Sequence, residues 1–164
     1  SKRFFKSVTS ALLSSNAPRV HQIIFQWMAS SQCFGPGWAD TCEHFLSDEE
    51  RWMGALPLAL DYLLDFDNRD TRGWPTLWLA VVERLGATDE LMLVADRWIT
   101  QASQKLSRWP DILHRRLQLG EVGGQVRKVP LTWIAAHEQH PYAGMIAEGL
   151  SRETVNLPWH ASVS

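Results

Sequence analysis

The chain has 164 residues, of which 45% are apolar and 21% charged, and its formal net charge is −2. A chain of this length buries roughly two thirds of its unfolded surface in one domain, and this composition excludes a disordered, collagen-like or coiled-coil protein. The small net charge argues against a surface built wholly for nucleic acid, and two cysteines are too few for a disulfide framework.

Apolar residues recur at the helical period through the first half of the chain. This spacing predicts helices near 5–12 and 20–28. Residues 47–50, Ser-Asp-Glu-Glu, have the form of a capping box and predict the start of another helix. Because a proline inside a helix removes a hydrogen bond and clashes with the preceding turn, we expect a new helix to begin at Pro57.

The clearest helical pattern covers 75–85, between Pro75 as a first-turn residue and Gly86 as a stop. Thr88 is a suitable N-cap for the helix that follows, and only two residues separate the pair. This short connection predicts an antiparallel αα-hairpin. A further helix is expected over 110–120, where Pro110 and Gly120 mark the ends.

Residues 121–129 alternate in polarity about a Gly-Gly pair, which predicts either a small β-hairpin or a loop. Two short helices are expected at 131–139 and 142–150, followed by a flexible tail from about 156. The prediction is an all-α single domain over 1–164, a helical bundle or an irregular array of about seven to nine helices. The first residue is Ser1, which fits both a chain that lost its initiator Met and a domain excised from a larger protein.

Nine tryptophans are about three times what average usage would give a chain of this length. Those inside helical segments are predicted to fill the core. Those beside Pro or Gly at element boundaries either pack on the first turn of a helix or contact a partner, since Trp is enriched at interfaces. Of this second group, which contains Trp38, Trp74, Trp109 and Trp159, we expect Trp38 and Trp159 to bind a partner.

Motifs for metal and catalytic chemistry miss their required spacing. His137 and His140 stand at i, i+3, and Pro141 occupies the position where a zinc protease helix needs its second imidazole. Residues 65–70 imitate the start of a calcium loop, but Arg69 occupies a ligand position. The sequence therefore favours a binding protein over an enzyme and predicts no metal or cofactor. An enzyme that uses His137, Glu138 and His140 with the acids of 65–70 stays open as an alternative.

Charge is unevenly distributed along the chain. Residues 39–70 hold nine acids and two bases, whereas residues 105–128 hold six bases and two acids. Helices commonly expose or pair such charges, but complementary patches also steer partners together. The predicted partner-binding charges are Asp65, Asp67 and Asp70 in the acidic region, and Arg115, Arg116, Arg127 and Lys128 in the basic region.

Residues 145–155 read Met-Ile-Ala-Glu-Gly-Leu-Ser-Arg-Glu-Thr-Val, which resembles the helix-turn-helix of bacterial regulators. The resemblance implies a turn at 149–151 and a recognition helix that starts at Arg152, although Pro158 would end that helix early. Residues 139–142 and the following helix resemble the closing segment of the helical chaperones that mature molybdoenzymes. That likeness covers about two dozen residues without the acidic-Pro-x-Asp-His centre of those chaperones.

These observations predict a protein–protein interaction module: an adaptor, an accessory subunit or a chaperone-like helical domain. Its partner is expected to be another protein, a larger complex or a second copy of the chain. The alternative is a nucleic-acid-associated protein that uses the basic 105–128 segment and the helix-turn-helix-like 145–155 segment. No run of eighteen apolar residues is present, so we expect a cytoplasmic protein without membrane insertion.

Overall fold

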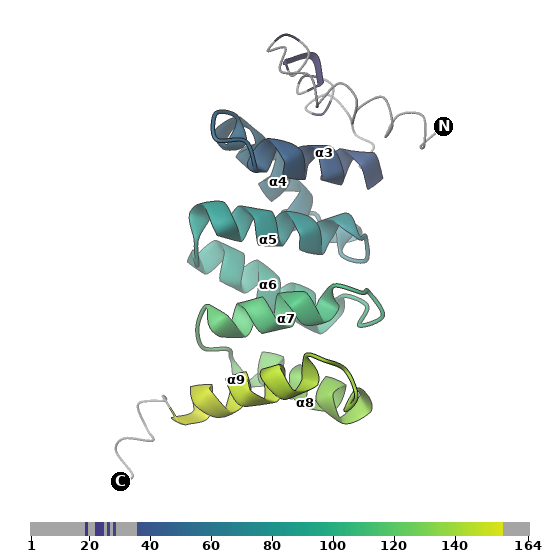
Figure 1. Cartoon of the computed structure of the whole chain (residues 1–164), viewed down its shortest axis with the longest axis vertical. Coiled ribbons are helices and arrows are strands. Elements are labelled where there is room, and N and C mark those ends of the chain that lie inside the picture. Colours follow the sequence, from purple (N-terminus) through teal and green to yellow (C-terminus); the bar gives the residue numbers. More distant parts are fainter. Residues whose placement is uncertain (1–18, 20–21, 25, 27, 29–35, 156–164) are drawn as a thin grey trace. The chain divides into compact units, whose positions relative to one another are not determined.

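The computed structural model describes residues 19, 22–24, 26, 28 and 36–155 (Figure 1). Its regular elements are helices, and no strand occurs among these residues, so the all-α prediction is confirmed. The expected helix at 5–12 and the expected tail from about 156 lie outside the described residues. The elements are α3 (Pro36–Leu46), α4 (Trp52–Leu64), the 3-10 turn η1 (Phe66–Asn68), α5 (Gly73–Leu85), α6 (Asp89–Gln101), α7 (Trp109–Gln118), α8 (Gly124–Ala136) and α9 (Ala143–Val155).

The chain divides into two compact units, unit 1 over residues 1–86 and unit 2 over residues 87–164. Each unit has its own packed helices and its own core. The αα-hairpin expected between the helices at 75–85 and 88–102 crosses the boundary of the units, so it stays a prediction. No helix in the described part of the chain is long and apolar enough to cross a membrane.

Within residues 36–86, unit 1 contains three mutually packed helices, because α3 contacts both α4 and α5, and α4 contacts α5. The core residues between them are mostly aromatic or large and aliphatic, as expected where three helices bury one face each. The fully buried side chains include Trp38, Phe45, Tyr62, Leu63, Trp74, Leu77 and Trp78.

Unit 2 is a four-helix arrangement in which each helix has two packing neighbours. Helix α6 contacts α7 and α8, and α9 contacts the same two helices. The prediction that the helical tryptophans fill the core is confirmed for Trp98 and Trp133 here and for Trp78 in unit 1, whereas Trp52 is half-buried. The remaining large core residues of unit 2 are Leu91, Ile99, Trp109, Ile112, Leu113 and Ile146.

Two predicted helix boundaries agree with the structure. Helix α6 begins at Asp89, and the Thr88 hydroxyl accepts a hydrogen bond from the Leu91 amide at 3.3 Å. This N-cap satisfies one of the amides that the first turn leaves without a partner. Helix α5 ends at Leu85 because Gly86 follows with a φ of 76°, a conformation that residues with a Cβ rarely adopt.

The expected restart at Pro57 is wrong, because α4 continues through this proline from Trp52 to Leu64. Pro57 and Met53, one turn earlier, are both exposed. The Met53 carbonyl that loses its usual amide partner therefore lies on the water side of the helix, where solvent can satisfy it.

The β-hairpin expected over 121–129 is also wrong, and the alternative of a loop holds only for 121–123, because residues from Gly124 onward belong to α8. Val126, Pro130 and Trp133 stand at i, i+4 and i+7 and are the buried residues of this helix. A proline is confined to the edges of sheets, whereas the helical spacing brings all three side chains into the core of unit 2. The 3.6-residue period of the buried side chains thus overrides the local alternation about the glycines.

Candidate functional site

The outer face of α4 presents a stripe of apolar side chains to solvent. Met53, Pro57, Leu60 and Leu64 stand at i, i+4, i+7 and i+11, which places them on one side of the helix. Met53 is 67% exposed and Leu64 is 47% exposed, and Leu60 is half-buried. Large apolar side chains gathered along one helix face mark a contact surface more often than isolated ones do. We call these four residues the α4 stripe.

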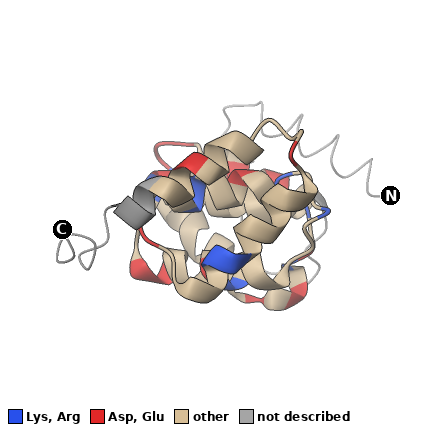
Figure 2. Ribbon diagram, turned by 90° about the horizontal axis from the view of Figure 1, so that it is seen from below, with Lys and Arg blue, Asp and Glu red and all other residues tan. Residues whose placement is uncertain are grey.

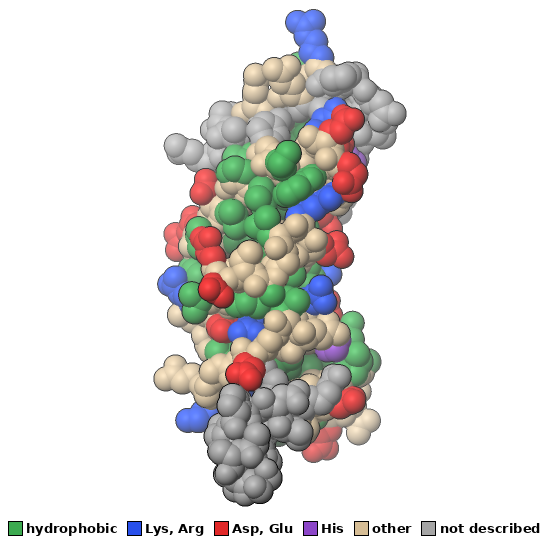
Figure 3. Space-filling model, turned by 90° about the vertical axis from the view of Figure 1, so that its left-hand side faces the viewer, with side chains coloured by type: hydrophobic (Ala, Val, Ile, Leu, Met, Phe, Trp, Pro, Cys, Tyr) green, Lys and Arg blue, Asp and Glu red, His purple; other side chains and the backbone are tan. Residues whose placement is uncertain are grey.

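The opposite side of α4 holds the helix firmly in unit 1. Its inward residues Ala55, Ala59, Tyr62 and Leu63 are buried. The small Ala side chains let a neighbouring helix approach closely, and α4 packs on both α3 and α5. Helix α4 is therefore apolar on both sides, and its packing within unit 1 uses only one of them. Figure 3 shows hydrophobic side chains gathered on one face over unit 1, with charged side chains at their margins.

Polar contacts fix the carboxyl end of α4. The indole N–H of Trp74 donates to the Leu63 carbonyl at 3.0 Å, and the Asn68 side-chain amide donates to the Tyr62 carbonyl at 3.1 Å. Thr71 donates its hydroxyl proton to the Asn68 carbonyl at 2.7 Å, so the Tyr62 hydroxyl is the donor in its 2.6 Å bond to Thr71. Burial raises the pKa of Tyr62 above its usual value.

The amino end of α4 is held by two arginines that are already engaged. Arg51 donates to Asp48 at 2.7 Å. Arg84 donates to the Leu46 carbonyl at 2.7 Å and to Glu49 at 3.1 Å, and its guanidinium carbon lies 5.4 Å from the centre of the Trp52 ring. The backbone amide of Glu50, with a further contribution from Arg51, holds the pKa of Asp48 below its usual value.

Exposed acidic residues flank the α4 stripe in the sequence. Between residues 48 and 70 the chain holds seven acids and two bases. Glu50 precedes the helix, Asp61 lies on it, and Asp65 and Asp67 follow it, and all four are exposed. We call these four residues the acidic border. The candidate site is the α4 stripe together with this border.

The predicted acidic site residues follow the carboxyl end of α4 in the chain. Asp65 accepts a hydrogen bond from the Asp67 amide at 3.1 Å and caps η1. Asp70 lies 3.7 Å from Arg69, so its charge is partly compensated. The structure gives Asp65 and Asp67 a local turn-forming role and leaves their carboxylates at the surface.

Trp38 is a core residue rather than a surface anchor. It is 1% exposed, its indole N–H donates to the Met28 carbonyl at 3.2 Å, and its ring stacks on Tyr62 with centroids 5.2 Å apart. A side chain buried in this way offers no face to a partner while unit 1 is folded. Trp159, the other tryptophan predicted to bind a partner, lies outside the described residues.

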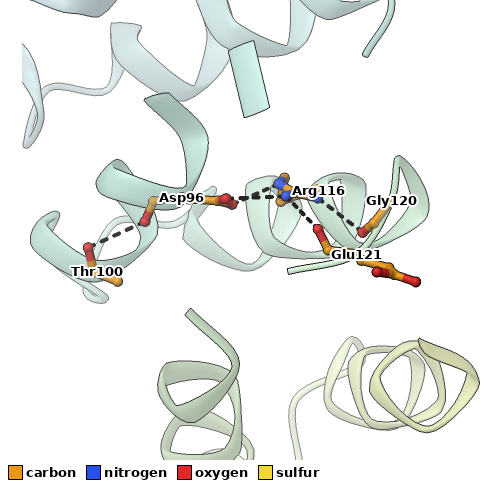
Figure 4. Close-up of polar contacts among 5 residues, drawn as sticks. All are labelled: Asp96, Thr100, Arg116, Gly120 and Glu121. Carbon is orange, nitrogen blue, oxygen red and sulfur yellow. Dashed lines mark hydrogen bonds and ion pairs between the residues drawn. The ribbon is translucent and has the colours of Figure 1, made fainter. Parts of the chain in front are cut away.

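The predicted basic site residues are used mainly inside unit 2. Arg116 is 4% exposed and forms a forked ion pair with Asp96, with N–O distances of 2.7 and 3.2 Å (Figure 4). The same guanidinium donates to the Gly120 carbonyl at 3.0 Å and to the Glu121 carbonyl at 2.8 Å. This network ties α6 to α7 and to the turn that follows α7, so Arg116 is a structural residue.

The other basic residues are spread over two helices. Arg115 donates to the Gln118 side chain at 3.3 Å, Arg127 donates to the Leu150 carbonyl at 2.8 Å, and Lys128 is exposed. Figure 2 shows the basic segments of the ribbon interrupted by acidic and uncharged ones. The predicted basic residues therefore do not act as one group: Arg116 and Arg127 support the fold, and Lys128 is at the surface.

The turn implied by the helix-turn-helix resemblance is absent. Residues 145–155 lie within the single helix α9, which runs from Ala143 to Val155. Ile146 and Leu150 are four residues apart and both buried, so the helix must continue through Gly149 to bring them to the same face. The packing of this apolar pair explains why the local Gly-Leu-Ser signal does not end the helix.

The histidines considered for catalysis lie among aromatic rings in unit 2. The His137 ring stacks on Trp133 with centroids 4.7 Å apart, and the His140 ring meets Trp133 edge-on at 5.0 Å. Their Nδ1 atoms are occupied, because His137 donates to the Trp133 carbonyl at 2.9 Å and His140 accepts from the Tyr142 amide at 3.1 Å. A surface depression of about 540 Å³ is lined by residues 135–140.

The acids of 65–70 belong to unit 1 and these histidines to unit 2. No group of three or more His, Cys, Asp or Glu side chains within the described ranges is placed to hold a metal ion. The structure therefore gives His137 and His140 a defined role in the packing and turn around Trp133.

The α4 stripe is the feature that the sequence analysis missed. The sequence pattern that predicts this stripe was nevertheless present. Residues 52–64 contain one apolar set at 55, 59, 62 and 63, and a second apolar set at 53, 57, 60 and 64. Two apolar sets on opposite sides of one helix exceed what a helix on the surface of a small unit needs for its own packing. Comparisons of the chain with protein-family models, curated proteins and solved structures found no match.

Proposed function

We propose that this chain is a protein–protein interaction module that docks a partner on the α4 stripe. The observation that carries the proposal is the exposure of Met53 and Leu64 on a helix whose other side is already packed. Removing such side chains from water on binding contributes about 1–2 kcal/mol each. Because polar contacts fix α4 within unit 1, binding needs little reordering of the surface.

Adaptor, accessory subunit and chaperone-like protein are finer descriptions that depend on the partner. Nucleic-acid binding is a weaker candidate, since Arg116 and Arg127 serve internal contacts and 145–155 forms one helix. Catalysis at His137 and His140 has less support than docking, because both imidazoles have structural partners.

The test uses the full chain and two matched variants. Met53→Ser with Leu64→Ser makes the α4 stripe polar without adding charge. Leu93→Ser with Leu131→Ser changes two exposed leucines of unit 2, which are 70% and 57% exposed, and serves as the control. Each protein is immobilised and exposed to native lysate at moderate salt, with and without nuclease, and retained proteins are quantified by mass spectrometry.

We expect the unmodified chain and the unit 2 control to retain the same stoichiometric protein, with or without nuclease. The α4 variant should lose that protein while keeping the same far-ultraviolet circular dichroism. The proposed function would be overturned if the α4 variant retained the same amount of that protein as the unmodified chain. It would also be overturned if nuclease abolished the retention.

A further inference from the structure

The length and shape of the α4 stripe fit a helical partner. Met53 and Leu64 are eleven residues apart, so the stripe extends for about 16 Å along three turns of helix. A straight row of side chains at i, i+4, i+7 and i+11 is the surface against which another helix packs by ridges and grooves. An extended peptide adds to the edge of a sheet, and no sheet is present in the part of the chain that the structure describes.

Charge around the stripe discriminates between helical partners. Glu50 lies before the first turn of α4, Asp61 lies within the helix, and Asp65 caps the turn after it. The two arginines at the amino end, Arg51 and Arg84, already pair with Asp48 and Glu49. An approaching helix therefore meets one carboxylate before the amino end of α4 and several near its carboxyl end.

We infer that the partner that docks on the α4 stripe is an amphipathic helix whose apolar row is flanked by Lys or Arg. Long basic side chains at its edges would reach the acidic border while its apolar row covers Met53 and Leu64. A helix with Glu or Asp at the same positions would place like charges side by side and be rejected. This inference rests on the proposed function and specifies the chemistry of its partner.

Two synthetic helical peptides of about sixteen residues test the inference. They share one row of leucines, and one carries Lys at every flanking position where the other carries Glu. Binding of each labelled peptide to the full chain is measured by fluorescence anisotropy. We expect the Lys peptide to bind at least about tenfold more tightly, and the advantage to shrink as salt rises from about 50 mM to about 300 mM.

Two variants separate the contributions of charge and apolar contact. Asp61→Asn with Asp65→Asn removes two charges of the acidic border and keeps acceptor oxygens. The ratio of the affinities of the Lys and Glu peptides should therefore fall several-fold. Glu138→Gln with Glu148→Gln removes two exposed charges of unit 2 and should leave it unchanged. Met53→Ser with Leu64→Ser should weaken the Lys peptide about tenfold or more.

The outcomes distinguish this inference from the proposed function. If both peptides bind equally and the stripe variant weakens both, the basic partner is wrong and docking on α4 stands. Tighter binding of the Glu peptide, or no binding of either, also overturns the inference, and lysate retention then decides the proposed function by itself. If the Lys peptide binds the stripe variant as tightly as the unmodified chain, the inference is also overturned. Charge attraction alone would then account for the binding, without contact to the apolar row.

Discussion

The two units use the same residue types in different ways. In unit 1 the buried indoles of Trp38 and Trp74 donate to backbone carbonyls, and acids stay at the surface beside an exposed apolar row. In unit 2 the rings of Trp109 and Trp133 lie 5.8 Å apart, and a buried Arg116 pairs with a half-buried Asp96. Unit 1 therefore carries two of its exposed large apolar side chains, Met53 and Leu64, on one face of one helix, whereas the exposed Leu93 and Leu131 of unit 2 stand on different helices.

The charged side chains of the two units also differ in their surroundings. The buried guanidinium of Arg116 makes four hydrogen bonds within unit 2, which engage most of its five N–H donors. Exposed carboxylates such as Asp61 have no such constraint from the core. We therefore expect partner binding to depend on unit 1. We expect the free energy of unfolding to fall most when a charged side chain of unit 2 is removed.

The largest effect is expected from Arg116→Ala in unit 2. The change leaves the Asp96 carboxylate and two carbonyls without their donor, and breaking a buried pair in this way lowers the free energy of unfolding by about 3–5 kcal/mol. Denaturant unfolding of the full chain measures it. Arg115→Ala, beside it on α7, is the control and should change stability by less than about 1 kcal/mol. A loss of similar size for both variants would contradict the structural role of Arg116.

A close approach in unit 1 predicts the next largest effect. A Cβ on Gly73 would meet the Cβ of Ala39 on α3, with the Tyr62 hydroxyl 3.0 Å away. Gly73→Ala should therefore lower the free energy of unfolding by about 1–3 kcal/mol. Gly144 in α9 has open space around its Cα, so Gly144→Ala should be neutral or stabilising by about 0.5–1 kcal/mol. Equal effects at the two sites would show that α3 and α5 are not packed closely at Gly73.

Two Trp→Phe changes sharpen the comparison of the cores. Trp74→Phe removes the donor of the Leu63 carbonyl, whereas the buried indole N–H of Trp109 has no hydrogen-bond partner among the described residues. Both changes lose similar ring volume, so Trp74→Phe should be the more destabilising by about 1 kcal/mol. Thermal unfolding followed by calorimetry tests this order. Greater destabilisation by Trp109→Phe would mean that its N–H is satisfied.

The smallest predicted effect depends on pH and concerns Asp48. Because its pKa is lowered in the folded chain, its carboxylate stabilises the fold at pH values above its unfolded pKa of about 3.9. This contribution is lost as the pH falls through the folded pKa. The difference in unfolding free energy between the unmodified chain and Asp48→Ala should be constant from about pH 5 to 7 and shrink below about pH 4. A difference that grows on acidification would contradict this assignment.

The sequence was sufficient for elements whose signals agree with their packing. The apolar period of 75–85 and the N-cap at Thr88 predicted α5 and the start of α6, because local capping and core contacts favour the same structure there. The core placement of Trp78, Trp98 and Trp133 followed from the same helical spacing. Fold class was therefore predictable from patterns within single elements.

The sequence was insufficient where contacts between elements decide the outcome. The Gly-Gly pair at 123–124 suggested a turn, but packing of Trp133 and Pro130 draws the segment into α8. Arg116 looked like a surface base because its partner Asp96 is twenty residues away. The α4 stripe became evident only when α3 and α5 were seen to contact the opposite side of that helix.

The most direct test of docking on unit 1 is amide hydrogen exchange of the full chain, alone and bound to the protein that it retains from lysate. Docking on the α4 stripe predicts slower exchange over 52–64 in the complex and unchanged exchange over 124–136. Protection confined to helices of unit 2, with 52–64 unaffected, would contradict the account.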